Sequence, residues 1–342
     1  MVTEAQVSEY HDHHLSAGSL RTRDLGAALD DEYDVVFLGS SWDARCLALE
    51  STNLAASRVV VFLPKNRGTS GRRAQHDARL LAWARGVGDL VVVEDDSEEL
   101  ARVHDALVGE LAEVRKLADR PIRVLIDLSA MTRYFTLGLV ARCLNDSVAS
   151  VVDVVYAEGI YRDGPGEPVA PATDAAALWD AVGIPMLEGD WYPTHGRHFL
   201  VSAGFEGHAV ARLADRWDPD SIAVLLPIPG LLPAYEARVR TANETWMRHV
   251  EVEPQDVWQA PAADALAAWK LLAEARHLDS PGRNLYCLLN GSKPHALGIT
   301  LFALARATPA VLYVRPTRHL ERDITATGDY WRYRLRDRTL MG

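Results

Sequence analysis

The stretch VVVFLP at residues 59–64 recurs 163 residues later as IAVLLP at residues 222–227. The same offset aligns IDLS at residues 126–129 with LNGS at residues 289–292. Each match contains or ends an apolar run of the length and composition of a buried strand. A repeat this long is too large for the unit of a solenoid. The sequence therefore predicts two copies of one α/β unit.

Apolar runs alternate with helical patterns through both halves of the chain. We expect strands at residues 35–38, 59–63, 90–93, 124–126 and 151–156, and again at 199–202, 222–226, 248–252, 285–289 and 310–314. Helices are expected between them, at 42–54, 72–85, 97–118, 131–144, 206–217, 232–247, 261–276 and 293–306. This alternation predicts mostly parallel sheets with helices on both faces. The predicted fold is α/β, with two tandem Rossmann-like units that arose by internal duplication.

Composition shifts suggest where the units begin and end. We expect a leader at 1–32, the first unit at 33–161, a turn-rich linker at 162–196 and the second unit at 197–342. Residues 174–196 are expected to hold a short helix and an irregular connection, and residues 330–335 to close the second unit as an edge strand. The cluster YHDHH at residues 10–14 contains metal-ligand residue types, but we interpret it as part of a flexible polar leader. No metal site and no cofactor are expected.

The composition is that of a soluble globular protein, with 48% hydrophobic and 24% charged residues among 342. No apolar run reaches the ~18 residues of a membrane span, and no signal-peptide pattern opens the chain. We therefore expect a cytoplasmic protein without membrane partners. Cys46, Cys143 and Cys287 lie in apolar patterns and are expected to be reduced, buried thiols. The net charge of −11 argues against an extended nucleic-acid surface.

Small and polar residues follow the first strand of each unit, where open α/β sheets bind ligands. These loops are GSSWDAR at residues 39–45 and SAGFEGH at residues 202–208. Neither matches a dinucleotide or P-loop fingerprint. Each leads into a helix N-terminus, which favours phosphate, although ordinary helix capping would select similar residues. The candidate ligand-binding residues here are Ser40, Ser41, Trp42, Arg45, Gly204, Phe205 and Glu206.

The loops after the fourth and fifth strands give further candidates. After the fourth strands lie DLSAMTR at 127–133 and NGSKPH at 290–295. A Gly-Ser-Lys turn permits a tight corner, a helix cap and an anion contact, and we expect Arg133 to act like Lys293 from one turn further along its helix. Capping with surface charge is the alternative interpretation. The candidates for binding are Ser129, Arg133, Gly291, Ser292 and Lys293 in these loops, and Arg315 after the last strand.

At these corners the chain resembles the CRISPR-associated Rossmann-like (CARF) sensor domains and their fused two-unit relatives, the SAVED domains. The resemblance is carried by Asn290-Gly291-Ser292-Lys293, which is similar to the Gly-Thr-Lys turn of that family, and by the loops Ser40-Ser41 and Ala203-Gly204. It implies binding of a cyclic oligonucleotide or another nucleotide signal in a bacterial antiviral defence system. Ser40, Ser41, Gly291, Ser292 and Lys293 would then contact the ligand.

Three functions remain open from the sequence. The first is a sensor that binds a nucleotide or nucleotide-derived ligand and acts on an effector protein or on its own assembly. The second is an enzyme that cleaves an N-glycosidic or phosphodiester bond, with Asp43, Asp127 and Glu158 as catalytic carboxylates. The third is a non-catalytic interaction subunit. In the sensor, Trp42 or Phe205 would stack on a base.

Overall fold

Strands and helices alternate along most of the chain in the computed structural model, which describes residues 6–65, 71–95, 99–146, 148–161, 179–316 and 324–340. The chain divides into two compact units, one made of Met1–Glu167 with Arg322–Gly342 and the other of Pro168–Glu321. Within the described ranges, no helix is long and apolar enough to cross a membrane. Residues 162–178, the first part of the expected linker 162–196, lie outside the described residues.

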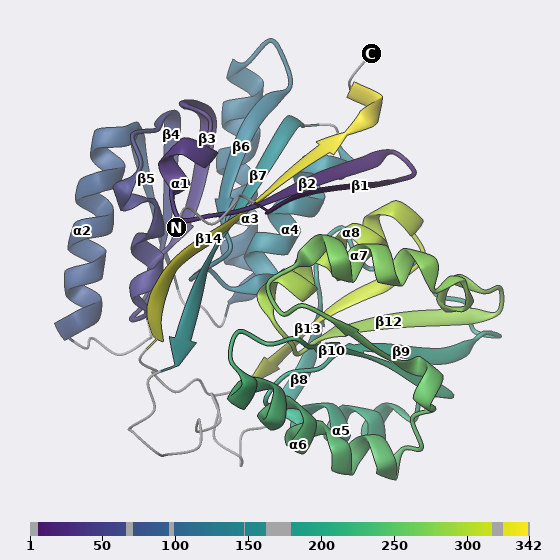
Figure 1. Cartoon of the computed structure of the whole chain (residues 1–342). Helices are drawn as coiled ribbons and strands as arrows, with labels where there is room; N and C mark the ends of the chain where they lie inside the picture. Colours follow the sequence, from purple (N-terminus) through teal and green to yellow (C-terminus); the bar gives the residue numbers. More distant parts are fainter. Residues whose placement is uncertain are drawn as a thin grey trace. The chain divides into compact units, whose positions relative to one another are not determined.

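The first unit is built on an eight-stranded sheet in the order β1-β2-β14-β7-β6-β3-β4-β5 (Figure 1). Its elements are β1 (Gln6–Asp12), β2 (Leu15–Thr22), α1 (Leu25–Ala28), β3 (Glu32–Gly39), the 3-10 helix η1 (Ala44–Ser51), β4 (Ala55–Pro64), α2 (Gly71–Val87), β5 (Asp89–Asp95), α3 (Leu100–Leu117), β6 (Ile122–Asp127), α4 (Arg133–Asn145), β7 (Ala149–Tyr161), β14 (Ile324–Asp337) and η4 (Arg338–Leu340). Strands β3 to β7 are parallel to their neighbours among themselves. Numbered from β3, their order is 3-2-1-4-5, which is the order of a Rossmann-like half-sheet.

The second unit repeats this order in a six-stranded sheet, β11-β10-β9-β12-β13-β8. Its elements are β8 (Trp179–Gly183), β9 (Gly196–Ser202), α5 (Gly207–Trp217), β10 (Ser221–Pro227), α6 (Pro233–His249), η2 (Pro254–Asp256), β11 (Val257–Ala260), α7 (Ala265–Glu274), η3 (Arg276–Asp279), β12 (Arg283–Leu289), α8 (Lys293–Arg306) and β13 (Ala310–Pro316). Strands β9 to β13 are parallel, and β8 joins the edge antiparallel to β13. The predicted α/β class with two mostly parallel sheets is confirmed.

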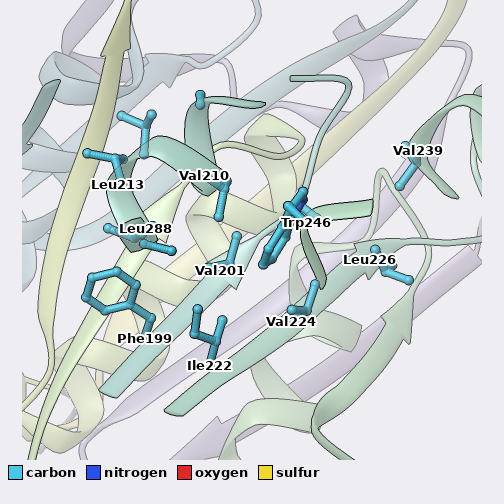
Figure 2. Packing of buried hydrophobic residues seen from close by; sticks show 14 of the residues in the cluster. Phe199, Val201, Val210, Leu213, Ile222, Val224, Leu226, Val239, Trp246 and Leu288 are labelled. Carbon is cyan, nitrogen blue, oxygen red and sulfur yellow. The ribbon is translucent and has the colours of Figure 1, made fainter. Parts of the chain in front are cut away.

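Helices cover both faces of the second sheet. In Figure 1, α5 and α6 lie on one face, and α7 and α8 lie on the other. Trp246 of α6 is 4% exposed and packs with residues of α5 and of the central strands. Figure 2 shows this cluster, in which the labelled neighbours of Trp246 are Phe199, Val201, Val210, Leu213, Ile222, Val224, Leu226, Val239 and Leu288. The continuous apolar runs of β9 and β10 are therefore explained by burial on both sides.

One predicted strand of the second unit is wrong. Residues 248–252 were expected to form it, but α6 continues to His249 and the strand is β11, at Val257–Ala260. Glu251 adopts a left-handed conformation with φ 53°, which ends the helix. Val250 and Val252 pack against the core beside α6, so their apolar alternation reflects helix-end packing rather than a strand.

The two chain ends also differ from expectation. Residues 6–22 of the expected leader form the hairpin β1–β2. Residues 330–335 belong to β14, which lies inside the first sheet, antiparallel to β2 and β7, and does not close the second unit. Alternating burial along β14, with Trp331, Tyr333 and Leu335 buried, explains why its strand character was predictable and its neighbours were not. Residues 179–183, expected within a short helix or irregular connection, form β8.

Candidate functional site

Each unit has its own topological switch point, where the order of neighbouring strands reverses. It lies between β3 and β6 in the first unit and between β9 and β12 in the second. Ligands of open α/β sheets bind at the carboxyl ends of the strands at such points. The loops predicted from the repeat follow these four strands, so the structure brings the candidates of each unit to one edge of its sheet.

Close backbone approach at the switch points explains the glycines. A Cβ on Gly39 would lie 2.9 Å from Cα of Met131, in the loop after β6. In the second unit, Gly204 meets the carbonyl of Asn290, and a Cβ on Gly291 would collide with Oγ of Ser202 and lie 2.6 Å from the carbonyl oxygen of Ala203. The glycine pattern at these corners therefore reflects contact between loops.

We expect Gly291→Ala to lower the free energy of unfolding by about 1 to 3 kcal/mol, because overpacking of a closely packed contact forces the backbone to shift. Gly109→Ala on α3 is the matched control, since a Cβ there meets nothing within 4 Å, and alanine favours a helix over glycine. Urea unfolding of both variants measures the difference. Equal stability of the two variants would remove the steric explanation.

In the first unit, the loop after β3 is tied to α2 and to its own polar residues. Ser40 donates a hydrogen bond to Asp77, and the carbonyl of Ser41 contacts Nδ1 of His76 at 3.0 Å. The side chain of Asp43 caps η1 by accepting from the backbone N–H of Arg45 at 3.0 Å. Ser40 and Ser41 are buried, so their hydroxyls are largely shielded from solvent.

Asp43 and Arg45 form a buried ion pair, with Nη2 of Arg45 2.6 Å from Oδ2 of Asp43. Arg45 also donates to the carbonyl of Ala157 at 3.2 Å and lies over the ring of Tyr156. Burial alone would lower the pKa of Arg45, but the charge of Asp43 outweighs it, and the pKa lies above its ordinary value. Arg45 therefore links the loop after β3 to β7 at Ala157.

The other two candidate carboxylates lie around the same segment of β7. Asp127 accepts from the backbone N–H of Ser129 at 2.8 Å, and Oγ of Ser129 accepts from the N–H of Ala157 at 2.8 Å. Glu158 accepts from Nε1 of Trp331 at 2.7 Å and from Arg21 at 3.1 Å. Asp43 through Arg45 and Asp127 through Ser129 are thus linked to the backbone of Ala157, the neighbour of Glu158 in the chain. Each of the three carboxylates is at most 5% exposed.

The two aromatic candidates are Trp42 in the first unit and Phe205 in the second, and both are half-buried. The guanidinium of Arg238 lies 4.7 Å from the centroid of the Phe205 ring, and Tyr235 contacts that ring edge-on at 5.5 Å. Arg238 was not among the ligand-binding residues predicted from the sequence. A cation over one ring face places positive charge directly beside the loop after β9.

The backbone of the loop after β9 is held by amide side chains. Asn243 of α6 donates to the carbonyl of Gly204 at 2.8 Å, and Asn290 donates to the carbonyl of Glu206 at 3.1 Å. Asn290 follows β12, so this second bond joins the two loops that flank the switch point. The two asparagines therefore fix the shape of the candidate site, a role that their spacing in the sequence does not reveal.

The helices after the fourth strands begin alike in the two units. Ser292 caps α8, its Oγ accepting from the N–H of His295 at 3.2 Å, and Lys293 is the first helical residue. Thr132 holds the corresponding N-cap position of α4, without a side-chain hydrogen bond to the helix, and Arg133 is the first residue of that helix. Arg133 was expected one turn further along; instead the two cations occupy equivalent positions. Lys293 and Arg133 are both half-buried.

His295 is a buried group at this edge that the sequence did not reveal as important. It is fully buried, and its Nε2 donates to the carbonyl of Pro261 at 3.0 Å. The N–H of Ala262 in turn donates to the carbonyl of Pro229 at 2.9 Å. These contacts join the loops after β10, β11 and β12 into one rim. Burial lowers the pKa of His295 to about 4, against the opposing effect of the backbone carbonyls.

The remaining candidates lie apart from the switch points. Arg315 is half-buried near the end of β13, in register with Asp180 of the edge strand β8. Of the cluster at residues 10–14, residues 10–12 end β1, and His13 and His14 form the turn before β2. The described part of the chain contains no group of three or more side chains placed to hold a metal ion. Cys46, Cys143 and Cys287 are buried, and burial raises the pKa of each thiol.

The fold and the two switch points define an α/β protein with two Rossmann-like sheets. No protein-family model matches the chain, and no curated protein matches it significantly.

Proposed function

We propose that the chain is a sensor that binds a phosphate-bearing nucleotide signal at the carboxyl edge of the second sheet. The observation that carries the proposal is the start of α8, where Lys293 follows the Ser292 cap directly beside the switch point. A cation at the first position of a helix lies at the positive end of the helix dipole. An anion bound there would be attracted by Lys293 and by the helix terminus together.

The second unit is the preferred site because more of its loop groups are accessible. In the first unit, Ser40, Ser41, Asp43 and Ser129 are each at most 8% exposed and take part in intramolecular hydrogen bonds. In the second, Phe205, Glu206, Ser292 and Lys293 are all half-buried. Accessible polar and aromatic groups favour contact with both the phosphate and the base of a nucleotide.

The resemblance to CARF and SAVED domains supports a nucleotide as the ligand class, because it rests on the same Gly291-Ser292-Lys293 turn. A cyclic oligonucleotide in an antiviral defence system is the specific form of this proposal. The output would be a change in an effector protein or in assembly, driven by the difference in ligand affinity between two states.

We expect Lys293→Ala to weaken nucleotide binding by about 1 to 3 kcal/mol, through loss of a charge-assisted contact to phosphate. Arg133→Ala is the matched control, since it removes a cation from the equivalent position of the first unit. Calorimetric titration with mono-, di- and cyclic oligonucleotides, preceded by a thermal-shift screen, measures both. A larger loss in Arg133→Ala would assign the site to the first unit.

Cleavage of the nucleotide during the same titrations distinguishes the enzyme hypothesis from the sensor hypothesis. The candidate catalytic carboxylates Asp43, Asp127 and Glu158 all lie in the first unit, so in the enzyme, cleavage would be expected to fail in Asp127→Asn while the protein stays folded. A ligand recovered intact by mass spectrometry supports the sensor, and a cleaved ligand supports the enzyme. Absence of binding to all the nucleotides would reject the proposal. The non-catalytic interaction subunit would then be the remaining function.

A further inference from the structure

Strand β1 forms one end of the eight-stranded sheet, and within the described ranges it pairs with β2 alone. The two strands pair without a bulge from Gln6–Arg21 to Asp12–Leu15. The sequence of β1, QVSEYHD, contains neither the proline nor the lysine that commonly protect an exposed edge. Val7 is 66% exposed. This edge therefore keeps the backbone groups that could pair with another strand.

The other sheet edges are less suited to pairing. At the opposite end of the same sheet, β5 begins with Asp89 and ends with Asp95. These carboxylates are already paired with Arg58 and Arg102, so they are not available for charge pairing with a second copy. In the second unit, β11 and β8 are only four and five residues long. Strand β1 has seven residues, and it is the edge with the fewest obstacles.

Hairpin geometry decides which residues of β1 face outward. A two-residue turn, His13-His14, joins the strands, and the flanking pair Asp12–Leu15 exchanges hydrogen bonds in such a hairpin. Hydrogen-bonded and non-hydrogen-bonded residue pairs alternate along an antiparallel pair of strands. The pairs that Val7, Glu9 and His11 form with β2 are therefore not hydrogen-bonded, and the backbone groups of these residues point away from β2. The side chains of these three residues are exposed on one face of the sheet.

The outward residues are complementary to themselves in one register. If two β1 strands pair antiparallel with Tyr10 opposite Tyr10, Glu9 of each copy lies opposite His11 of the other. A register two residues lower places Glu9 opposite Glu9, where like charges repel. On β2, the neighbours of Glu9 and His11 are Gly18 and Ser16, which leave the carboxylate and the imidazole available for this pairing.

We propose that β1 is a homotypic interface, through which two copies of the chain pair antiparallel with Tyr10 at the twofold axis. The occupant is a second copy because this register places the Glu9 carboxylate of each strand opposite the His11 imidazole of the other, and an imidazole N–H can donate to a carboxylate. A single strand pair is a small interface, so the association is weak and depends on concentration. This inference does not depend on the proposed nucleotide site.

Charge exchange on the full chain tests the interface. Sedimentation of the native protein over a concentration series should show a dimer, and His11→Glu should abolish it, because Glu9 of each copy would then face the introduced carboxylate of the other. The double variant Glu9→Lys/His11→Glu should restore it with the charges reversed. Glu113→Lys, an exposed change on α3, should leave the dimer intact. A monomeric native protein, a dimer unaffected by His11→Glu or a double variant that stays monomeric would overturn the proposal.

A cysteine at the axis tests the register independently. Tyr10→Cys should give an oxidised, disulfide-linked dimer, because residues directly opposite in such a pair lie within disulfide range. Ser8→Cys should not, because position 8 faces position 12 in this register. The three natural cysteines are buried, so they do not compete at this surface. Equal crosslinking of the two variants, or none in Tyr10→Cys, would contradict the proposed pairing.

Discussion

Replacing Arg334 with methionine is expected to lower the free energy of unfolding by about 3 to 5 kcal/mol, because it leaves a buried carboxylate without its cation. Asp153 is fully buried on β7. Arg334 of β14 donates to it twice, at 3.0 and 2.7 Å, and Tyr33 of β3 donates its hydroxyl at 2.7 Å. Burial and the nearby carboxylate raise the pKa of Tyr33, so the hydroxyl keeps its proton and cannot replace the lost charge.

Chemical denaturation of Arg334→Met beside Arg336→Met measures this effect. Arg336 lies two positions along the same strand, on the same face, and makes no ion pair within the described chain, so its replacement should change stability by no more than about 0.5 kcal/mol. Adding Asp153→Asn to Arg334→Met should recover part of the loss, because no charge then remains buried at residue 153. Strictly additive losses would show that the two side chains act independently.

The Arg334–Asp153 pair also shows where prediction from sequence stopped. The alternation of Trp331, Tyr333 and Leu335 was sufficient to predict a strand at 330–335, since period-two burial is a local signal. The position of that strand beside β7 depends on a pairing across 181 residues, which no local pattern encodes. The repeat carried the prediction further elsewhere, because a strand assigned in one copy supported the strand assigned at the equivalent position of the other.

At the candidate site, the sequence located the loops but not the roles of their residues. Small residues at 39, 204 and 291 could be recognised as a corner motif. Their function in loop contact depends on which atoms lie opposite: a Cβ added at residue 291 would collide with Oγ of Ser202. Asp43 and Arg45 were considered as separate candidates, yet they form one ion pair. Because these two residues have opposite charges and lie two positions apart, the sequence could have suggested that they form an ion pair.

His295 was missed because a histidine in an apolar helix pattern gives no sign of its hydrogen-bond partner, Pro261, which is 34 residues away. The structure predicts a consequence for stability. The pKa of His295 is about 4 in the folded protein, against an ordinary value of 6.5. Between these values the unfolded chain binds a proton that the folded chain excludes. The contribution of His295 to stability is therefore complete above pH 6.5 and is lost as the pH falls toward 4.

The expected loss is about 3 kcal/mol, since each unit of pKa difference corresponds to about 1.36 kcal/mol. His295→Gln isolates it, because the glutamine amide can donate to the Pro261 carbonyl as Nε2 does but does not titrate. The unfolding free energy of this variant, measured by denaturant at several pH values, should fall less steeply between pH 6.5 and 4 than that of the native protein. Subtracting the curve of the variant from that of the native protein removes the contribution of the carboxylates, which titrate in both proteins.

His249→Gln provides the matched control, since the side chain of His249 is 74% exposed and its removal should leave the native slope unchanged. If His295→Gln also kept the native slope, the buried imidazole would have to be protonated in the folded protein, with an acceptor for its second N–H. That result would change the description of the rim, because Nδ1 would then donate a hydrogen bond. A flattened slope instead establishes that a neutral histidine joins the loop after β11 to the start of α8, beside Lys293.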